Sequence, residues 1–495
     1  MSKEMKIFLV GGAVRDKLLG KESDDLDYVV LNGTPEKMLA LGFTEAGKDF
    51  PVFLHPETKN EHALARMERS TGKGYNDFES SWEGVTLEDD LMRRDLTINA
   101  MAEDENGQIV DIFGGQKDLE NKVLRHVSEA FKEDPLRILR VARFASKMKD
   151  FTVAPETMSM MQEMVKDGMI DHLTPERVWK EWWRAMVTPE PHRFFEVLKD
   201  TGALKVLFPV LDKMKDVPQR ADYHAEGDVF VHTMMVLKEA TELTKDMDED
   251  RRLLVRMGAL LHDVGKTKTP HELLYNEDGS MRGSHTGHDD PKVARPLIQE
   301  LKEQYKLSDF ITRFCLDVAA FHQRIHSVKK MKKTSGWAKL FNDMKIRQHA
   351  DELGEDHYLE NILLACKADA RGRLMTVDNK IVPASREYEQ ADIMKEQFQE
   401  YKKALVVVGE FFTVAKDYKL NIEPKTFPTL RSEVIVMAME KKSFFDILSD
   451  RLSKENRNML RSKGFDFPIS NKELKKQQKQ EEIRQRKEAR RKNRP

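Results

Sequence analysis

Apolar and polar positions follow two different periods along the chain. Residues 7–10 are all apolar and end at glycine, which predicts a short buried strand, and residues 12–19 continue with apolar positions at helical spacing. From about residue 126 onward the apolar positions recur mainly with a helical period. The pattern therefore predicts an α+β protein whose N-terminal head contains the strands. Further strands are predicted at 28–31, 50–54 and 62–65.

The same pattern divides the chain into five regions. A length of 495 residues leaves room for three or four domains. Residues 70–84 are rich in Gly, Ser and Asp, which predicts a loop inside the head. The expected regions are residues 1–125 (head), 126–220 (helical neck and body), 221–375 (helical, with many histidines), 376–470 (helical C-terminal region) and 471–495 (basic tail).

The tail is rich in Lys, Arg, Gln and Glu and nearly lacks large apolar residues. This composition predicts a solvated helix or a disordered segment, because it cannot bury enough apolar surface to fold. Its positive excess would suit contacts with RNA phosphates, or would simply keep the chain soluble. The sequence leaves both interpretations open.

Charge and cysteine content narrow the class of protein. Charged residues make up 34% of the chain but the net charge is only −2, so any nucleic-acid contact must come from local patches. The two cysteines, Cys315 and Cys366, show no CxxC spacing, which argues for a reducing compartment and against a disulfide or zinc framework. No apolar run suits a signal peptide or a membrane span. We expect a soluble cytoplasmic protein without a membrane partner.

The most informative stretch joins a glycine turn to a pair of carboxylates. Gly11 and Gly12 connect the first predicted strand to a helix, and the free N–H groups of such a turn face anions well. Asp25 and Asp27 are two residues apart in a predicted strand that continues into residues 28–31, so they point the same way. Two close carboxylates repel each other unless a cation lies between them. Together these features indicate metal-assisted phosphoryl transfer.

Three other features have two interpretations each. Glu61 at the start of a predicted strand would supply a third carboxylate or face solvent. Arg137, Arg140 and Arg143 recur every three residues after a helix start at Asp134-Pro135, which indicates either an exposed basic helix or a binding face. The tryptophans at 179, 182 and 183 indicate packing rather than base stacking.

Together the glycine pair, the Arg15 that follows it, Asp25-Leu26-Asp27 and the Arg93–Ala100 run RRDLTINA resemble the bacterial CCA-adding tRNA nucleotidyltransferases. The resemblance implies a small mixed-sheet head followed by all-α regions. It implies that Asp25 and Asp27 are catalytic and hold Mg²⁺, and that Asp95 orders the site. It also implies that Asp134 and Arg137 hydrogen-bond the incoming base. The residues expected at the nucleotide phosphates are Gly12, Arg15, Arg94, Arg140 and Arg143.

A second set of residues resembles the HD phosphohydrolases. His262 and Asp263 end an apolar helix and are followed by Gly-Lys, with His232 upstream and Asp369 far downstream. By this resemblance the four would hold a divalent transition metal such as Ni²⁺ or Mn²⁺, since imidazoles and carboxylates from separate helices suit such ions. His285 and His288 are further candidates for this site.

Both resemblances imply one function. The protein would add C, C and A to the 3′ end of tRNA from CTP and ATP, and its HD region would hydrolyse 2′,3′-cyclic or terminal phosphates, acting as a monomer or homodimer. Alternatives are a poly(A) polymerase, a CC- or A-adding specialist, and an HD phosphohydrolase or RNA-binding protein with a vestigial head. Residues 47–50, Gly-Lys-Asp-Phe, depart from the basic segment typical of poly(A) polymerases.

Overall fold

The computed structural model describes residues 4–23, 25–46, 52–65, 67–70, 78–81, 84–281, 285–420, 422, 426–464 and 479–481. The chain forms two compact units. One comprises residues 1–320 together with 368–384, and the other comprises 321–367 together with 385–495. None of the described helices combines the length and the apolar character that a membrane crossing requires.

The head is built on one sheet with strand order β3-β4-β5-β2-β1-β8-β9. The neighbours β2 and β5 are parallel, with Tyr28 opposite His62, whereas the other pairs are antiparallel. This mixed sheet and the helical remainder confirm the predicted fold class. The strands are β1 (Lys6–Val10), β2 (Tyr28–Leu31), β3 (Thr44–Glu45), β4 (Val52–Leu54), β5 (Glu61–Leu64), β8 (Ala102–Glu103) and β9 (Ile109–Val110).

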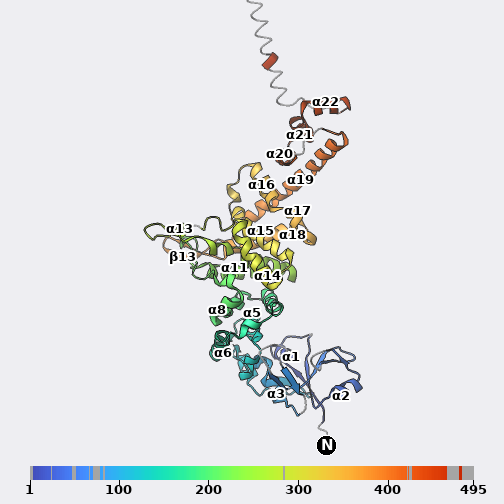
Figure 1. The fold of residues 1–495 in the computed structure, drawn as a ribbon, viewed down its shortest axis with the longest axis vertical. Helices are drawn as coiled ribbons and strands as arrows, with labels where there is room; N and C mark the ends of the chain where they lie inside the picture. The colour runs from blue at the N-terminus through green and yellow to red at the C-terminus, as the bar shows by residue number, and fades with distance from the viewer. Residues whose placement is uncertain are drawn as a thin grey trace, which may run out of the picture. The chain divides into compact units, whose positions relative to one another are not determined.

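Short helices and one separate hairpin complete the head (Figure 1). Strands β6 (Met67–Ser70) and β7 (Phe78–Ser81) pair with each other in antiparallel register. The loop predicted over 70–84 is therefore wrong for Ser70 and for 78–81, because the pairing of the two strands is not visible in local composition. The predicted loop residues 71–77 and 82–83 lie outside the described residues. The helices are α1 (Gly12–Leu18), α2 (Pro35–Ala40), α3 (Leu87–Met92), η1 (Thr97–Asn99) and α4 (Gly115–Glu120).

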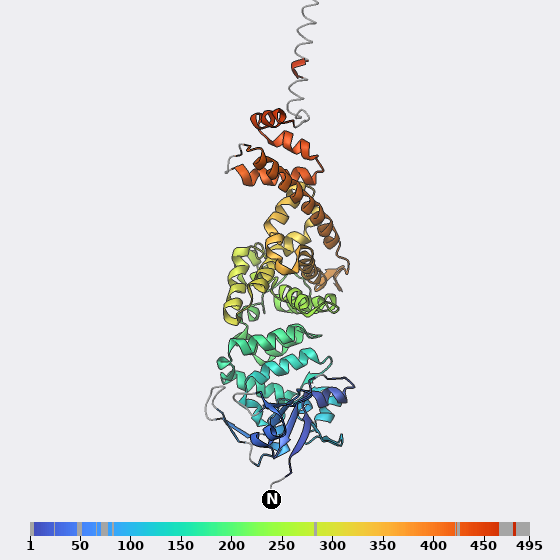
Figure 2. The same cartoon turned by 90° about the vertical axis from the view of Figure 1, so that its right-hand side faces the viewer.

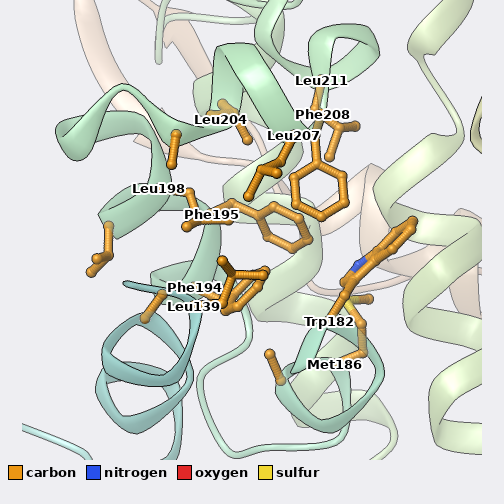
Figure 3. Packing of buried hydrophobic residues seen from close by; sticks show 14 of the residues in the cluster. Leu139, Trp182, Met186, Phe194, Phe195, Leu198, Leu204, Leu207, Phe208 and Leu211 are labelled. Atoms are coloured by element: carbon orange, nitrogen blue, oxygen red, sulfur yellow. The ribbon is translucent and has the colours of Figure 1, made fainter. Parts of the chain in front are cut away.

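The neck follows the head within the same unit, as cyan and green helices beside the blue strands (Figure 2). Its core packs Phe194 and Phe195 of α8 towards Trp182 of α7 and Phe208 (Figure 3). Trp182 is fully buried and meets Phe208 edge to face at 5.0 Å between ring centroids, as the packing interpretation expects. The elements are β10 (Val123–Leu124), η2 (Glu129–Glu133), α5 (Leu136–Lys147), β11 (Thr152–Val153), α6 (Pro155–Lys166), η3 (Met169–His172), α7 (Pro175–Met186), α8 (His192–Thr201), α9 (Ala203–Leu207) and α10 (Pro209–Asp212).

The histidine-rich part of the first unit is held by two close helix contacts. A Cβ on Gly258 would lie 2.8 Å from the Phe314 ring, and one on Gly372 would lie 2.6 Å from the Val236 Cα, so both positions require glycine. The second contact brings the end of α18 against α11. The elements are α11 (Val229–Leu243), α12 (Glu249–Leu261), η4 (Val264–Lys268), α13 (His271–Leu274), α14 (Pro291–Tyr305), α15 (Asp309–His326), α18 (Glu355–Arg371), β12 (Leu374–Val377) and β13 (Lys380–Pro383).

The second unit is helical in its described residues. Phe341 of α16 packs on Phe398 and Tyr401 of the 28-residue helix α19. A cavity of about 620 Å³ is lined by residues of α16, α20 and α21. Most of the basic tail lies outside the described residues. The elements are η5 (Val328–Lys330), α16 (Thr334–Met344), α17 (Ile346–His349), η6 (Asp351–Leu353), α19 (Gln390–Asp417), α20 (Phe427–Met439), α21 (Phe444–Arg451) and α22 (Lys454–Ser462).

Candidate functional site

Three carboxylates gather at one edge of the head sheet. Asp27 directly precedes β2 and Glu61 begins β5, and these strands are parallel neighbours with Tyr28 opposite His62. The two acidic residues therefore occupy equivalent positions on adjacent strands. Partial burial and the charges of Asp25 and Glu61 raise the pKa of Asp27, while Arg94 lowers it. This arrangement supports the third-carboxylate interpretation of Glu61.

The sequence predicts that the two aspartates lie in a strand. This is wrong, because β2 begins only at Tyr28. The segment is nevertheless tied to the sheet, since the Val10 N–H donates to the Asp27 carbonyl at 2.9 Å. Both aspartates remain accessible to solvent, although neighbouring groups partly cover Asp27, so an external ion and substrate can reach them.

The glycine turn lies against Arg94. Gly11 has φ +73°, and a Cβ there would lie 2.7 Å from Arg94 Nη1. Gly12 begins α1, so the N-terminus of this helix and the Arg94 guanidinium lie beside the same glycine turn. Asp90 accepts from the other nitrogen, Nη2, at 3.3 Å. The predicted anion-binding turn and the predicted phosphate-binding Arg94 are thus brought together.

A chain of buried hydrogen bonds links two other predicted arginines. Arg15 of α1 donates to the Asn99 side-chain oxygen, and the Asn99 amide donates to Asp95 Oδ1 at 3.0 Å. Arg140 of α5 donates to Asp95 Oδ2 at 2.7 Å. Burial tends to raise the pKa of Asp95, but Arg140 and Asn99 outweigh burial and hold that pKa below its usual value. Asp95 thus remains ionised and positions both cations.

The remaining neck residues are held by partners that sequence reasoning missed. Arg143 donates to the buried Glu181 of α7. Asp134 accepts from Arg177 Nη2 at 3.1 Å through both carboxylate oxygens. Arg137 donates to the carbonyl oxygens of residues 93 and 130, and burial lowers its pKa. Asn99 lies four residues after Asp95, a spacing that signals contact, whereas no local pattern links 143 with 181 or 134 with 177.

The second site brings together all four residues predicted for it. His232 Nε2 lies 3.3 Å from Asp369 Oδ1 and 3.7 Å from Asp263 Oδ2. His262 Nε2 lies 3.1 Å from Asp263 Oδ2 and 3.7 Å from Asp369 Oδ1. All four side chains are buried. The long helices α11, α12 and α18 therefore converge on one point with two imidazoles and two carboxylates.

The electrostatics of this cluster favour a cation. His262 Nδ1 donates to the Ala259 carbonyl at 2.7 Å, so in neutral His262 the lone pair lies on Nε2, facing the carboxylates. Burial alone would lower the pKa of His262, but Asp263 and Asp369 outweigh it and raise that pKa to about 9. Burial would raise the pKa of Asp263, but the charges of His262 and Lys266 outweigh it and hold that pKa well below its usual range. Imidazole and carboxylate donors of this kind suit a divalent transition metal.

His285 and His288 differ in their relation to this cluster. His288 Nε2 lies 3.2 Å from Asp263 Oδ1, and Lys266 Nζ lies 2.7 Å from Asp263 Oδ2. His285 instead contacts the Thr269 hydroxyl at 2.8 Å and the Pro218 carbonyl at 3.0 Å, one through each ring nitrogen. His288 thus belongs to the site and His285 supports the loop around it. The sequence missed Glu226, a buried carboxylate whose pKa is lowered to about 2 because hydrogen bonds from His224 and His232 outweigh its burial.

Three family models match the chain. The Poly A polymerase head domain matches residues 7–125, the probable RNA and SrmB-binding site of polymerase A matches 150–215, and the HD domain matches 229–371. Multifunctional CCA proteins are similar over most of their length. That of Acinetobacter baumannii (strain AYE) is 46% identical over 398 residues, covering 80% of this chain and 89% of the relative. That of Dechloromonas aromatica (strain RCB) is 47% identical over 371 residues, covering 75% and 84%.

Solved structures share the fold. A CCA-adding enzyme in complex with ATP matches with a TM-score of 0.57 at 18% identity, covering 94% of this chain and 92% of that chain. The Thermotoga maritima CCA-adding enzyme complexed with tRNA matches with a TM-score of 0.54 at 18% identity, covering 92% and 91%.

Proposed function

Since the chain belongs to the family of multifunctional CCA proteins, which confirms the resemblance drawn from its sequence, we propose that its head adds C, C and A to the 3′ end of tRNA from CTP and ATP. The observation that carries this proposal is the group of Asp25, Asp27 and Glu61 beside Arg94 and the glycine turn. In this group, carboxylates that suit a metal ion lie beside N–H groups and a guanidinium that suit phosphates.

The acidic edge would hold the metal of the transferase. Asp25 and Asp27, with Glu61 beside them, present the hard oxygen donors that Mg²⁺ prefers. When bound, Mg²⁺ supplies a lowered pKa for the attacking 3′-hydroxyl and charge neutralisation at the α-phosphate. The tRNA 3′-oxygen forms the new bond to the α-phosphorus, and pyrophosphate leaves with the electrons of the bond that breaks.

The basic residues would bind the triphosphate and select the base. The Gly12 turn, Arg15, Arg94, Arg140 and Arg143 supply N–H donors and positive charge for the phosphates. Asp134 as acceptor and Arg137 as forked donor would match the edge of cytosine and, after a small shift, of adenine. Their hydrogen bonds to Arg177 and to the carbonyl oxygens of residues 93 and 130 support this role, because they fix both side chains in one region.

The second site would make the protein a phosphohydrolase as well. His232, His262, Asp263 and Asp369 would hold a transition metal such as Ni²⁺ or Mn²⁺, which when bound supplies a water acidic enough to attack phosphorus at neutral pH. We infer 2′,3′-cyclic or terminal phosphates of damaged tRNA ends as substrates, since their hydrolysis yields the 3′-hydroxyl that the head consumes. We further propose that the protein acts in the cytoplasm as a monomer or homodimer.

The experiment offers tRNA lacking its last three nucleotides, Mg²⁺ and labelled CTP and ATP, with products read at single-nucleotide resolution. We expect addition of C, C and A by the wild type and by Glu57→Ala, a control at an exposed acid of the head, and no addition by Asp25→Ala, Asp27→Ala. A growing A-tail would identify a poly(A) polymerase, and a stop after CC or a need for CC-ended tRNA would identify a specialist. No addition by any protein would leave only the phosphohydrolase.

A further inference from the structure

A buried carboxylate contacts the histidine–aspartate centre from behind. Glu226 precedes α11, and its side chain is only 1% exposed. Its Oε1 lies 2.9 Å from His232 Nδ1 and 2.8 Å from His224 Nδ1. Its Oε2 accepts from the Leu374 backbone N–H at 2.8 Å. Both oxygens are therefore occupied by protein donors.

These contacts determine where His232 carries its proton. An ionised carboxylate only accepts hydrogen bonds, so His232 must present an N–H at Nδ1. The lone pair of the neutral imidazole is then on Nε2, the atom that faces Asp369 at 3.3 Å and Asp263 at 3.7 Å. Nε2 is buried and has no hydrogen-bond donor among the described residues. Lone pairs on three sides of one point leave it suited to a cation.

The same carboxylate also joins two elements that bring ligands to the centre. His232 lies on α11, and Leu374 begins β12, five residues after Asp369 of α18. At this place Gly372 touches the backbone of Val236, so the two elements are in direct contact. Asp228, two residues after Glu226, caps α11 by accepting from the Val231 N–H at 2.8 Å. Glu226 is thus fixed at the junction of α11 and the chain after α18.

We propose that Glu226 is a positioning residue of this centre, which holds His232 in the Nδ1–H form with Nε2 directed at the metal and ties the Asp369 segment to it. This inference rests on the proposed metal-binding role of the four residues. Carboxylate partners of metal-bound histidines typically contribute 10- to 100-fold to metal affinity. His224 shares Oε1 but is not one of the four proposed ligands, so its contribution should be smaller.

The test measures the dissociation constants of Mn²⁺ and Co²⁺ for the full chain by competition with a chromophoric chelator, and the visible absorption of bound Co²⁺. We expect Glu226→Gln to bind both metals about 10- to 100-fold more weakly and to shift the Co²⁺ absorption bands. CCA addition should stay at its wild-type rate, which shows that the variant is folded at the assay temperature. Glu242→Gln, an exposed glutamate on the same helix, is the matched control and should change neither quantity.

Two further variants keep the test decisive. His224→Gln should weaken the metal less than threefold. A loss of one whole metal equivalent in this variant would instead show that His224, Glu226 and His232 bind a second ion, and would overturn the proposal. If Glu226→Gln loses CCA addition and therefore does not fold, Glu226→Asp, which withdraws the charge by one methylene, should show the weakened affinity.

The outcomes separate the inference from the function on which it rests. If the wild type binds neither metal, the proposed phosphohydrolase centre fails and the inference fails with it. If the wild type binds metal and folded Glu226→Gln binds it equally well, only the positioning role of Glu226 is overturned.

Discussion

Arg140 and Asp95 form an ion pair that joins the neck to the head, with both Nε and Nη2 of the arginine 2.7 Å from one carboxylate oxygen. The Asp95 side chain is buried, whereas that of Arg140 is 35% exposed. Since Arg140 is a proposed phosphate ligand, the pair has both a structural and a functional consequence.

Replacing this carboxylate should affect stability and nucleotide binding together. We expect Asp95→Asn to lower the free energy of unfolding by about 1–3 kcal/mol, because it weakens the bonds to a buried network. The KM for CTP and ATP should also rise, since Arg140 and, through Asn99, Arg15 lose their fixed positions. Urea unfolding followed by tryptophan fluorescence and steady-state kinetics measure the two effects. Asp150→Asn, which removes half of an exposed ion pair with Lys122, should change stability by less than about 1 kcal/mol and leave KM unchanged.

The glycine turn offers a second prediction with a matched control. Gly11→Ala places a Cβ 2.7 Å from Arg94 Nη1, whereas Gly20→Ala, at φ +68°, meets nothing within 4 Å. Both substitutions strain the backbone because φ is positive, and Gly11→Ala strains it more, because ψ at Gly11 is −126°, outside the left-handed helical region. Only Gly11→Ala should displace Arg94 and raise the KM for nucleotides, by roughly tenfold for the loss of one charge-assisted hydrogen bond. Equal KM values in the two variants would exclude this role for Arg94.

His192 predicts a pH dependence of stability in the neck. Burial lowers the pKa of this histidine, at the start of α8, from 6.5 to about 4. Between these values the unfolded state binds a proton that the folded state does not. The contribution of neutral His192 to the free energy of unfolding is therefore fully present above pH 6.5 and is lost as the pH falls towards 4. We expect the urea concentration at the unfolding midpoint to decrease when the pH is lowered from 7 to 4.5. This decrease should be smaller in His192→Gln than in the wild type. Tryptophan fluorescence suits this measurement, because three of the five tryptophans lie in α7. Parallel pH profiles would contradict the prediction.

The contact at Gly372 predicts a variant that separates the two activities. Gly372→Ala forces α18 away from Val236 and should move Asp369 relative to His232. We expect weaker Mn²⁺ binding and slower hydrolysis of 2′,3′-cyclic nucleotide, with unchanged CCA addition. Gly409→Ala, on an exposed face of α19 with open space around it, should leave both activities unchanged. A parallel loss of both activities would indicate general unfolding instead.

The sequence predicted those elements that depend on interactions between residues close together in the chain. The strand and helix over 6–18 follow directly from the apolar period and from glycine. In the same way Thr34, placed directly before Pro35, caps α2 by accepting from the Lys37 N–H at 3.3 Å. The hairpin β6–β7 could not be predicted from its composition, because its stability comes from pairing between two separate segments. The same holds for the extended segment at 25–27, which is held by Val10 rather than by a strand of its own.

The candidate sites show the same division. The four residues of the second site were predicted, because His-Asp pairs and their spacing along the chain carry a recognisable pattern. The structure places the Nε2 atom of each imidazole 3.1–3.7 Å from both carboxylates. Glu226, Arg177 and Glu181 were not predicted, since each acts through a partner distant in sequence or in an irregular segment. Hydrogen-bond partners of this kind become visible only when the chain is folded.

The first compact unit is discontinuous, and this has a consequence for synthesis of the protein. Its last segment, 368–384, brings Asp369 back to helices that end before residue 320. Asp369 emerges from the ribosome 106 residues after Asp263, a delay of about 5–20 s at ordinary translation rates. During that interval the nascent chain already holds every residue proposed for nucleotide transfer but lacks one of the four proposed for the metal. A message truncated within that interval would encode the transferase alone.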